Sequence, residues 1–315
     1  MCRVCGSAHD PERLSAREMM FGSREAFDYA MCRACGCLQI AQIPTDLDRH
    51  YPSAYYQIAE APLGAVPDWC STMLGCAIPV TMPFARFATP AARDAALARR
   101  ALDYYFPARR PALDAHILDV GCGSGSFLRA LGAAGYTDLL GVDPFYSAAS
   151  DDDSIEVRRA ALAALDGVGR WDLVMFHHSL EHVADQAGTL RAAARLLAPD
   201  GVLLVRIPVV PSAAWVEYGV DWVQLDAPRH LYLHSEQSLR IAARAAGLTL
   251  VDLRHDSTGF QFRGSELYRR DVPLFGAHPN RPSYSSAELR AFDRRAATAN
   301  ALGLGDQVAC LFRAA

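Results

Sequence analysis

The sequence predicts an α/β protein with a doubly wound sheet, preceded by a small module that binds a structural metal ion. Three observations lead to this prediction. Two C-x-x-C pairs stand near the N-terminus. After residue 111, short apolar runs alternate with segments of helical periodicity, as they do where helices connect parallel strands. A glycine-rich loop joins the first of these runs to the first helix.

The composition is that of an ordinary globular protein. Of 315 residues, 51% are hydrophobic and 21% are charged, which allows one large domain or two smaller ones. A net charge of −4 without a long basic run does not favour nucleic acid as a partner. The first ten residues have no apolar signal core, so we expect a cytoplasmic location. The sequence makes no prediction of the oligomeric state.

The cysteine pairs predict a zinc site. They are Cys2 with Cys5 and Cys32 with Cys35, and a glycine follows the second cysteine of each pair. Two such pairs supply the four thiolates of a closed tetrahedral site, so the zinc would be structural. A redox-active dithiol is the alternative, and Cys37 is a fifth cysteine that could compete as a ligand.

A connector of high apolar content follows the cysteine module. The region 62–87 contains four prolines and Asp68, which argue against a transmembrane helix, so we expect no integral membrane association. Contact with a membrane surface or an apolar substrate is the alternative. We therefore divide the chain into a zinc ribbon at residues 1–45, a helical connector or lid at 46–110 and a main domain at 111–315.

The glycine loop begins the main domain. His116 to Val120 is a short apolar strand, the loop GCGSG follows it, and Ser126 to Ala134 has helical spacing. This layout lets a ligand approach the backbone and a helix N-terminus. A second strand ends at Asp143, 18 residues beyond Gly125, where a carboxylate can accept both hydroxyls of a ribose. The two signals together indicate a ligand that contains adenosine.

The order of four motifs carries a family resemblance. LDVGCGSG, GVDP, WDLVMFHHSLEHV and LLAPDGVLLVRIP occur in that order between Leu113 and Leu253. In this respect the chain resembles the class I S-adenosylmethionine-dependent methyltransferases. The ribbon, with DAPRHLYLHSEQSL and FRGSELYRRDVPL, looks like a bacterial subgroup that pairs a four-cysteine zinc knuckle with this fold. The resemblance implies a Rossmann-like, seven-stranded sheet with an antiparallel last strand, and the cofactors S-adenosylmethionine and structural zinc.

The resemblance also implies a cofactor site. Asp119 and the glycine loop would hold the amino-acid part of S-adenosylmethionine, and Asp143 would bind its ribose. Pro144 and Phe145 would lie near its adenine. The full predicted cofactor set is Asp119, Gly121, Cys122, Gly123, Gly125, Asp143, Pro144, Phe145 and His177.

The stretch FHHSLEHV offers two interpretations. His178 and His182, with Glu181 beside them, form the H-x-x-E-H pattern of inverted zinc proteases. However, the strand Asp172 to Phe176 precedes them, and the carboxyl end of a parallel strand borders the ligand cleft. The resemblance instead makes LEHV the start of the helix after this strand. Structural hydrogen bonds of the histidines, and a helix-dipole role of Glu181, are further alternatives.

A long aromatic loop follows the next strand, Val202 to Ile207, and is predicted to contact the substrate. We place this substrate loop at residues 208–234 and an excursion of the main domain at 258–303. Arg229 could clamp a phosphate or carboxylate. The predicted substrate-binding residues are Trp222 and Arg229. The predicted catalytic residues are His178, His230, Tyr232, Glu181 and His182, with packed loop residues as the alternative for those in the loop.

The later elements complete the predicted sheet. Ser235 is a helix N-cap and Gly247 stops that helix. A strand over TLVDLRHD and a helix from Ala287 to Ala301 follow. Asp306 to Ala314 is the final strand, which the resemblance places antiparallel between its neighbours.

The predicted function is methyl transfer from S-adenosylmethionine to a small-molecule acceptor in biosynthesis. The acceptor would be a sugar, a nucleotide-sugar or a natural-product intermediate, and O-methylation is slightly favoured. An oxygen or carbon acceptor would need a base such as His178 or His230 to remove its proton. Sugar C- or N-methylation is the alternative. From other classes, a non-catalytic zinc-ribbon binding protein with a degenerate methyltransferase fold and a metalloprotease remain open.

Overall fold

The computed structural model describes residues 1–52, 89–146, 155–165 and 170–315. The predicted apolar connector, residues 62–87, lies outside these ranges. Among the described residues, no helix combines the length and the apolar character needed to cross a membrane.

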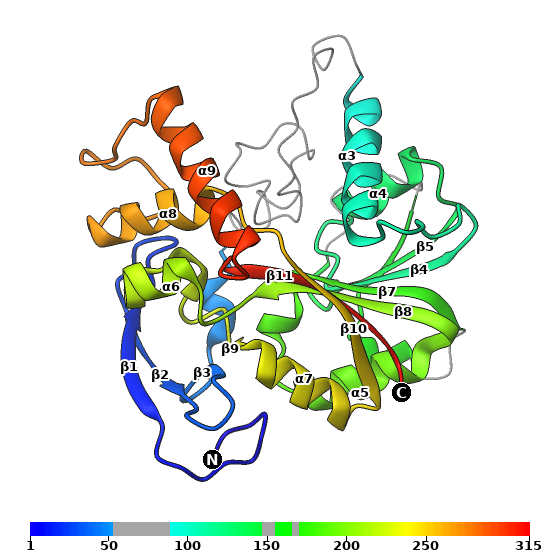
Figure 1. Cartoon of the computed structure of the whole chain (residues 1–315), viewed down its shortest axis with the longest axis horizontal. Coiled ribbons are helices and arrows are strands. Elements are labelled where there is room, and N and C mark those ends of the chain that lie inside the picture. Colours follow the sequence, from blue (N-terminus) through cyan, green and yellow to red (C-terminus); the bar gives the residue numbers. More distant parts are fainter. Residues whose placement is uncertain (53–88, 147–154, 166–169) are drawn as a thin grey trace.

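The main sheet has seven strands in the order β10-β11-β8-β7-β4-β5-β6 (Figure 1). Strands β4 to β8 pair in parallel, whereas β11 runs antiparallel between β8 and β10. This arrangement confirms the predicted doubly wound sheet and its antiparallel last strand. The bounds are β4 (His116–Val120), β5 (Asp138–Val142), β6 (Glu156–Arg158), β7 (Trp171–His177), β8 (Leu197–Pro208), β10 (Leu248–His255) and β11 (Gln307–Ala314).

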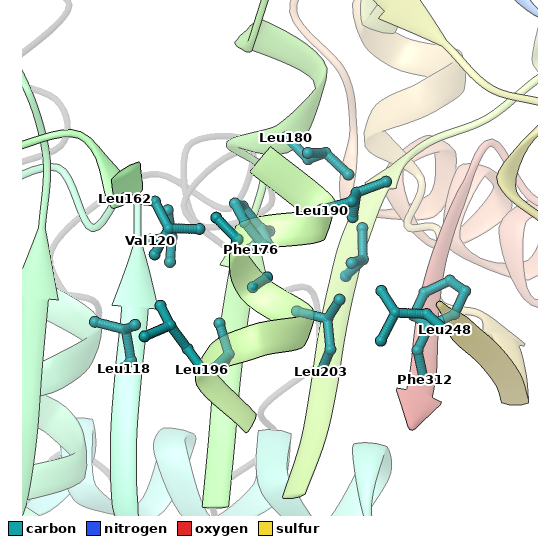
Figure 2. Close-up of a cluster of buried hydrophobic side chains, with 14 of the residues drawn as sticks. Leu118, Val120, Leu162, Phe176, Leu180, Leu190, Leu196, Leu203, Leu248 and Phe312 are labelled. Carbon is teal, nitrogen blue, oxygen red and sulfur yellow. The ribbon is translucent and has the colours of Figure 1, made fainter. Parts of the chain in front are cut away.

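Helices cover both faces of this sheet. Helices α5 (Gln186–Leu196) and α7 (Glu236–Ala245) lie on one face, and α3 (Pro90–Tyr105) and α4 (Ser126–Ala133) on the other (Figure 1). Alternate strand residues feed two cores, because successive side chains point to opposite faces. Leu118 packs under α5 and α7, while its neighbour Ile117 packs under α3 and α4. Figure 2 shows side chains of β4, β7 and β8 gathered against those of α5.

The capping signals agree with the structure except after β7. Ser235 caps α7 through a capping box with Ser238, and Gly247 has a positive φ beyond its end. The prediction that LEHV begins the next helix is wrong. Residues Leu180–His182 form a separate 3-10 turn, and α5 begins at Gln186 because the side chain of Asp185 caps it.

The N-terminal module builds a second, four-stranded sheet in the order β1-β2-β3-β9. Its strands are β1 (Glu12–Arg17), β2 (Ala26–Met31), β3 (Leu38–Ile40) and β9 (Tyr232–Leu233). The last of these belongs to the predicted substrate loop, and it pairs antiparallel with β3. The module and the loop also share one hydrophobic core, in which Tyr29 donates a hydrogen bond to the carbonyl of His230 (2.9 Å). The loop is thus held by the N-terminal module.

The remaining elements lie beside these two sheets. The excursion after β10 contains α8 (Phe260–Arg269) and α9 (Ser286–Ala301), and α8 packs against Met19 and Met20 of the N-terminal module. Shorter elements are the 3-10 turns η1 (Leu47–His50), η3 (Leu162–Leu165), η5 (Gly219–Asp221) and η6 (Val223–Leu225), together with α6 (Ala213–Tyr218).

Candidate functional site

A cavity of about 410 Å³ lies at the carboxyl ends of β4, β5 and β7. Its glycine end is formed by residues 119–124, 126, 127 and 143–145, and its histidine end by residues 177–179, 182 and 183. Among the predicted site residues, ten line the cavity: Asp119, Gly121, Cys122, Gly123, Asp143, Pro144, Phe145, His177, His178 and His182. A position at the ends of parallel strands is the usual one for a ligand in this architecture.

The loop at the glycine end requires its glycines. Gly121, Gly123 and Gly125 all have positive φ, a conformation that glycine adopts without strain. A Cβ atom on Gly121 would lie 2.4 Å from the Cβ of Ser179, so the loop also packs tightly on the histidine end. Asp143 accepts hydrogen bonds from the N–H of Gly123 (3.0 Å) and of Phe145 (2.8 Å). The carboxylate is therefore held in place while further lone pairs stay available to hydroxyl groups.

Asp119 is a buried carboxyl group at the glycine end of the cavity. Its side chain is 2% exposed, and its Oδ1 has no hydrogen-bond partner among the described residues. Burial, together with the nearby charge of Asp143, raises the pKa of Asp119 to about 7. A positively charged group in the cavity would supply the missing partner.

His177, the last residue of β7, and His178, which follows it, both form hydrogen bonds within the protein. His177 lies 3.1 Å from the Tyr105 hydroxyl through Nε2. The Nδ1 of His178 lies 3.3 Å from Oε1 of Glu181, and its Nε2 contacts the guanidinium of Arg206. Burial and the charge of Arg206 hold the pKa of His178 well below its usual value. His178 therefore accepts a hydrogen bond from Arg206 through Nε2, which does not support its predicted role as the base.

Glu181, His182 and His230 form a cluster in which one ligand-type atom of each lies within 4.8 Å of the others. Glu181 and His230 are buried, whereas His182 lines the cavity. Burial raises the pKa of Glu181 to about 8 and lowers that of His182 to about 3. The inverted-protease pair of His178 and His182 does not form such a group, because Arg206 occupies the Nε2 of His178.

Four predicted residues of the substrate loop lie outside the lining of the cavity: Trp222, Arg229, His230 and Tyr232. Arg229 is fully buried and donates to Asp226 and Glu18, as well as to the carbonyl of His50. Trp222 is fully buried and donates to Asp306 (2.9 Å). The hydroxyl of Tyr232 donates to the carbonyl of Ala184 (3.0 Å). These contacts do not support direct substrate binding. They join the loop to other segments of the protein instead.

Tyr51 and Arg206 contact predicted site residues but were not predicted from the sequence. Tyr51 stacks on Phe145 with ring centroids 6.3 Å apart, and its hydroxyl lies 3.1 Å from Nδ1 of His182. Arg206 lies fully buried in β8, where it forms an ion pair with Asp256 (2.5 Å). An arginine inside the apolar run VLLVRIP was a usable signal, because an arginine is rarely buried without a partner.

The four predicted zinc ligands come together in the structure. Their sulfurs lie within 4.8 Å of one another, with Cys2 to Cys35 and Cys5 to Cys32 both at 3.7 Å. A tetrahedron with Zn–S bonds of about 2.3 Å has edges of about 3.8 Å, so the cluster fits the ion. The thiol of Cys37 points instead to the carbonyl of Leu38, and it is not part of the group.

Part of the chain is similar to known proteins. Residues 91–253, about half of the chain, match the family model described as a methyltransferase domain. Over 131 residues the chain is 33% identical to the ubiquinone biosynthesis O-methyltransferase of Azorhizobium caulinodans, spanning 38% of this chain and 51% of that protein. Over 163 residues it is 34% identical to the same enzyme of Caulobacter sp., spanning 44% and 64%. The chain thus spans about half to two thirds of these curated relatives.

A solved structure with a similar fold is the 1,6-didemethyltoxoflavin-N1-methyltransferase of Burkholderia thailandensis, which contains bound 1,6-didemethyltoxoflavin and S-adenosylhomocysteine. The match has 16% identity and a TM-score of 0.41, and it covers 75% of this chain and 92% of that one. A similarity of this extent supports no argument about chemistry.

Proposed function

Because the chain belongs to the methyltransferase-domain family, we propose that it transfers a methyl group from S-adenosylmethionine to an oxygen of a small-molecule acceptor. The proposal assigns the glycine end to the methyl donor and the histidine end to the acceptor. The O-methyltransferase names of the similar proteins support oxygen over carbon or nitrogen. We also propose that Cys2, Cys5, Cys32 and Cys35 hold a structural zinc ion.

The glycine end suits each part of the donor. Within the described ranges, Oδ1 of the buried Asp119 has no hydrogen-bond partner, and an ammonium group would provide one. Asp143 is fixed by two backbone N–H groups and can accept from a ribose diol. Phe145 is 52% exposed and can lie against an adenine ring. When bound, the donor supplies a methyl group already activated by its sulfonium, so the protein's task is alignment.

The histidine end suits an acceptor that loses a proton. A hydroxyl gives up its proton when its oxygen is methylated, so the cavity must receive that proton or stabilise the ionised oxygen. His182 lines the cavity, and its Nδ1 donates a hydrogen bond to the carbonyl of Arg229 (3.0 Å). Its Nε2 then carries a lone pair that can accept a proton. The methyl group would leave the donor sulfur as the new C–O bond forms, and the acceptor's proton would depart at this end.

The observation that carries the proposal is the buried Asp119 beside the glycine loop, whose Oδ1 finds no hydrogen-bond partner among the residues that the structure describes. Calorimetry with S-adenosylhomocysteine tests the donor site. Asp143→Ala should weaken binding by at least about 10-fold, equivalent to roughly 1.4 kcal/mol. The matched control is Asp138→Ala, which removes an exposed carboxylate at the other end of the same strand. Equal affinities of the two variants would contradict the site.

The acceptor is identified by a direct assay. The chain is incubated with isotopically labelled S-adenosylmethionine and a panel of phenols, sugars and nucleotide-sugars, and the products are analysed by mass spectrometry. Label on an oxygen of one acceptor is the expected result, whereas label on carbon or nitrogen would favour the alternative reactions. If the wild-type chain releases no heat with the cofactor at high micromolar concentration, it is a non-catalytic binding protein.

A further inference from the structure

We propose that Glu181, His182 and His230 bind a divalent metal cation at the histidine end of the cavity. The site would take a first-row transition cation, and it would present that cation to the oxygen of the acceptor. This inference rests on the proposed function, because it concerns the end of the cavity that we assign to the acceptor. It is a site separate from the four cysteines, which belong to the N-terminal module.

The geometry of the three side chains is that of a ligand set. One nitrogen of each histidine and one carboxylate oxygen lie within 4.8 Å of one another, so a cation between them could reach all three. The residues come from two segments, since Glu181 and His182 lie in the 3-10 turn after β7 while His230 precedes β9. The imidazole rings of His182 and His230 have their centroids 4.8 Å apart.

The hydrogen bonds of both histidines leave the correct nitrogen available. Nδ1 of His182 lies 3.0 Å from the carbonyl oxygen of Arg229, and Nδ1 of His230 lies 2.7 Å from that of Gln224. A carbonyl oxygen only accepts, so the proton of each neutral ring must be on Nδ1. Each Nε2 then carries a lone pair. Histidines that bind metals typically donate their other N–H in this way.

One carboxylate oxygen of Glu181 is held by a hydrogen bond from His178, whereas the other has no hydrogen-bond partner among the described residues. Its Oε1 lies 3.3 Å from Nδ1 of His178, and Arg206 contacts the other nitrogen of that ring. The second oxygen, Oε2, is buried and has no hydrogen-bond partner within the described part of the chain. A buried carboxylate oxygen without a partner is costly. Oε1 also lies 4.0 Å from Nε2 of His230, so a cation held there by both oxygens of Glu181 would satisfy Oε2 as well.

The charged side chains around the cluster carry a net negative charge that a divalent cation would balance. The connected buried network contains four carboxylates and two guanidiniums: Glu18, Glu181, Asp226, Asp256, Arg206 and Arg229. The contact of Glu181 with His230 joins its two halves. With neutral histidines and ionised carboxylates, the states that metal ligands require, its net charge is −2. A divalent cation would neutralise this network. Asp226 also faces the cluster, with its Oδ2 3.8 Å from Nε2 of His230.

Two imidazoles and one carboxylate suit Zn²⁺, Co²⁺, Mn²⁺ or Fe²⁺, and they leave coordination positions open. An acceptor hydroxyl bound at an open position would ionise more readily, because the cation stabilises the oxygen anion. Its proton would pass to cavity water, and the oxygen would then take the methyl group. The site therefore predicts an acceptor whose methylated oxygen can coordinate a cation, such as a phenol or a vicinal diol.

The test uses the full chain with its cysteine site loaded with zinc. Co²⁺ is titrated in, and its visible ligand-field absorption reports binding at nitrogen and oxygen ligands. The wild type should bind one additional cation. His182→Gln and His230→Gln should each weaken binding by more than the roughly 10- to 100-fold loss seen when only an orienting residue is changed. His234→Gln is the matched control, because His234 is an equally buried imidazole bonded to Ser238 and Gln186.

Thermal unfolding of each variant shows that the chain remains folded, and Glu181→Gln provides a third variant of nearly unchanged shape. The proposal is overturned if the wild type binds no second Co²⁺ at millimolar concentration, or if folded ligand variants bind it as tightly as the control. Calorimetry with S-adenosylhomocysteine separates the two proposals. Donor binding without a second cation refutes only the metal site, whereas a second cation without donor binding refutes only the methyl-transfer function.

Discussion

The two ends of the cavity are built in different ways. The glycine end comes from one strand-loop-helix unit and the end of the next strand, all within residues 116–145. The histidine end depends on contacts among residues far apart in the chain, such as the ion pair of Arg229 with Glu18. Local backbone geometry therefore shapes one end, and buried side-chain charge shapes the other.

The two ends should therefore respond differently to loss of the N-terminal module. The glycine end should tolerate loss of the N-terminal module, because none of its strands pairs with that module. The histidine end should not tolerate this loss. Strand β3 of the module pairs with β9, which begins two residues after His230. Four variants test this contrast, taken from the largest expected effect to the smallest.

The double substitution Cys32→Ser and Cys35→Ser should have the largest effect. A structural zinc contributes apparent free energies of about 10 to 16 kcal/mol in small zinc modules, so the module should unfold. We expect loss of one zinc per chain and of methyl transfer, while affinity for S-adenosylhomocysteine changes by less than about 3-fold, or about 0.7 kcal/mol. Metal analysis and calorimetry measure both. Cys37→Ser is the control, and equal loss of donor binding would break the contrast.

Arg229→Ala should come next, through stability. The change leaves Asp226 and Glu18 buried without their cation, which typically costs about 3 to 5 kcal/mol. Urea unfolding measures this loss. Arg240→Ala removes an exposed ion pair with Glu236 and should cost less than about 1 kcal/mol. Similar costs for the two variants would mean that the buried network contributes little.

Asp119→Asn should separate stability from binding at the glycine end. The folded pKa of Asp119 is raised to about 7, so stability that is present at low pH is lost as pH rises through 7. Without ligand, the variant should therefore be more stable than the wild type at pH 8, by about 2 to 4 kcal/mol, and not at pH 4. Its donor affinity should fall. Thermal unfolding at both pH values and calorimetry test this, and a gain at pH 4 would contradict the assignment.

Phe145→Ala should have the smallest effect. Stacking of an aromatic side chain on another ring contributes about 0.5 to 1.5 kcal/mol, so donor affinity should fall by about 2- to 10-fold. The KM for the acceptor should stay the same, because Phe145 belongs to the glycine end. Steady-state kinetics with each substrate varied in turn measure both constants. A change in the acceptor KM alone would reverse the assignment of the two ends.

Much of the fold could be predicted because its signals are local. The strand-loop-helix unit, the caps at Ser235 and Gly247, and the antiparallel last strand are confirmed. The family match at residues 91–253 also confirms the methyltransferase resemblance. The helix start that the resemblance placed at LEHV was wrong, because those residues form a 3-10 turn and the helix begins after its N-cap, Asp185.

The substrate loop could not be interpreted in the same way. An arginine or tryptophan in a polar-aromatic loop has the same appearance in sequence whether it faces a ligand or the protein interior. The structure shows that Arg229 and Trp222 face interior carboxylates, contributed in part by Glu18 and Asp306. Such pairing depends on which distant segments meet.

By itself, the sequence determined the sheet, the glycine loop and the two cysteine pairs, because periodicity, positive-φ glycines and short ligand spacings act within a few residues. The tertiary structure alone decided which polar groups share the histidine end. It brought Glu181 and His182 to His230, which is 48 residues from His182, and it placed Arg206 behind His178. Burial then set the charge of these groups, since the cost of a buried charge depends on every neighbour that packs around it.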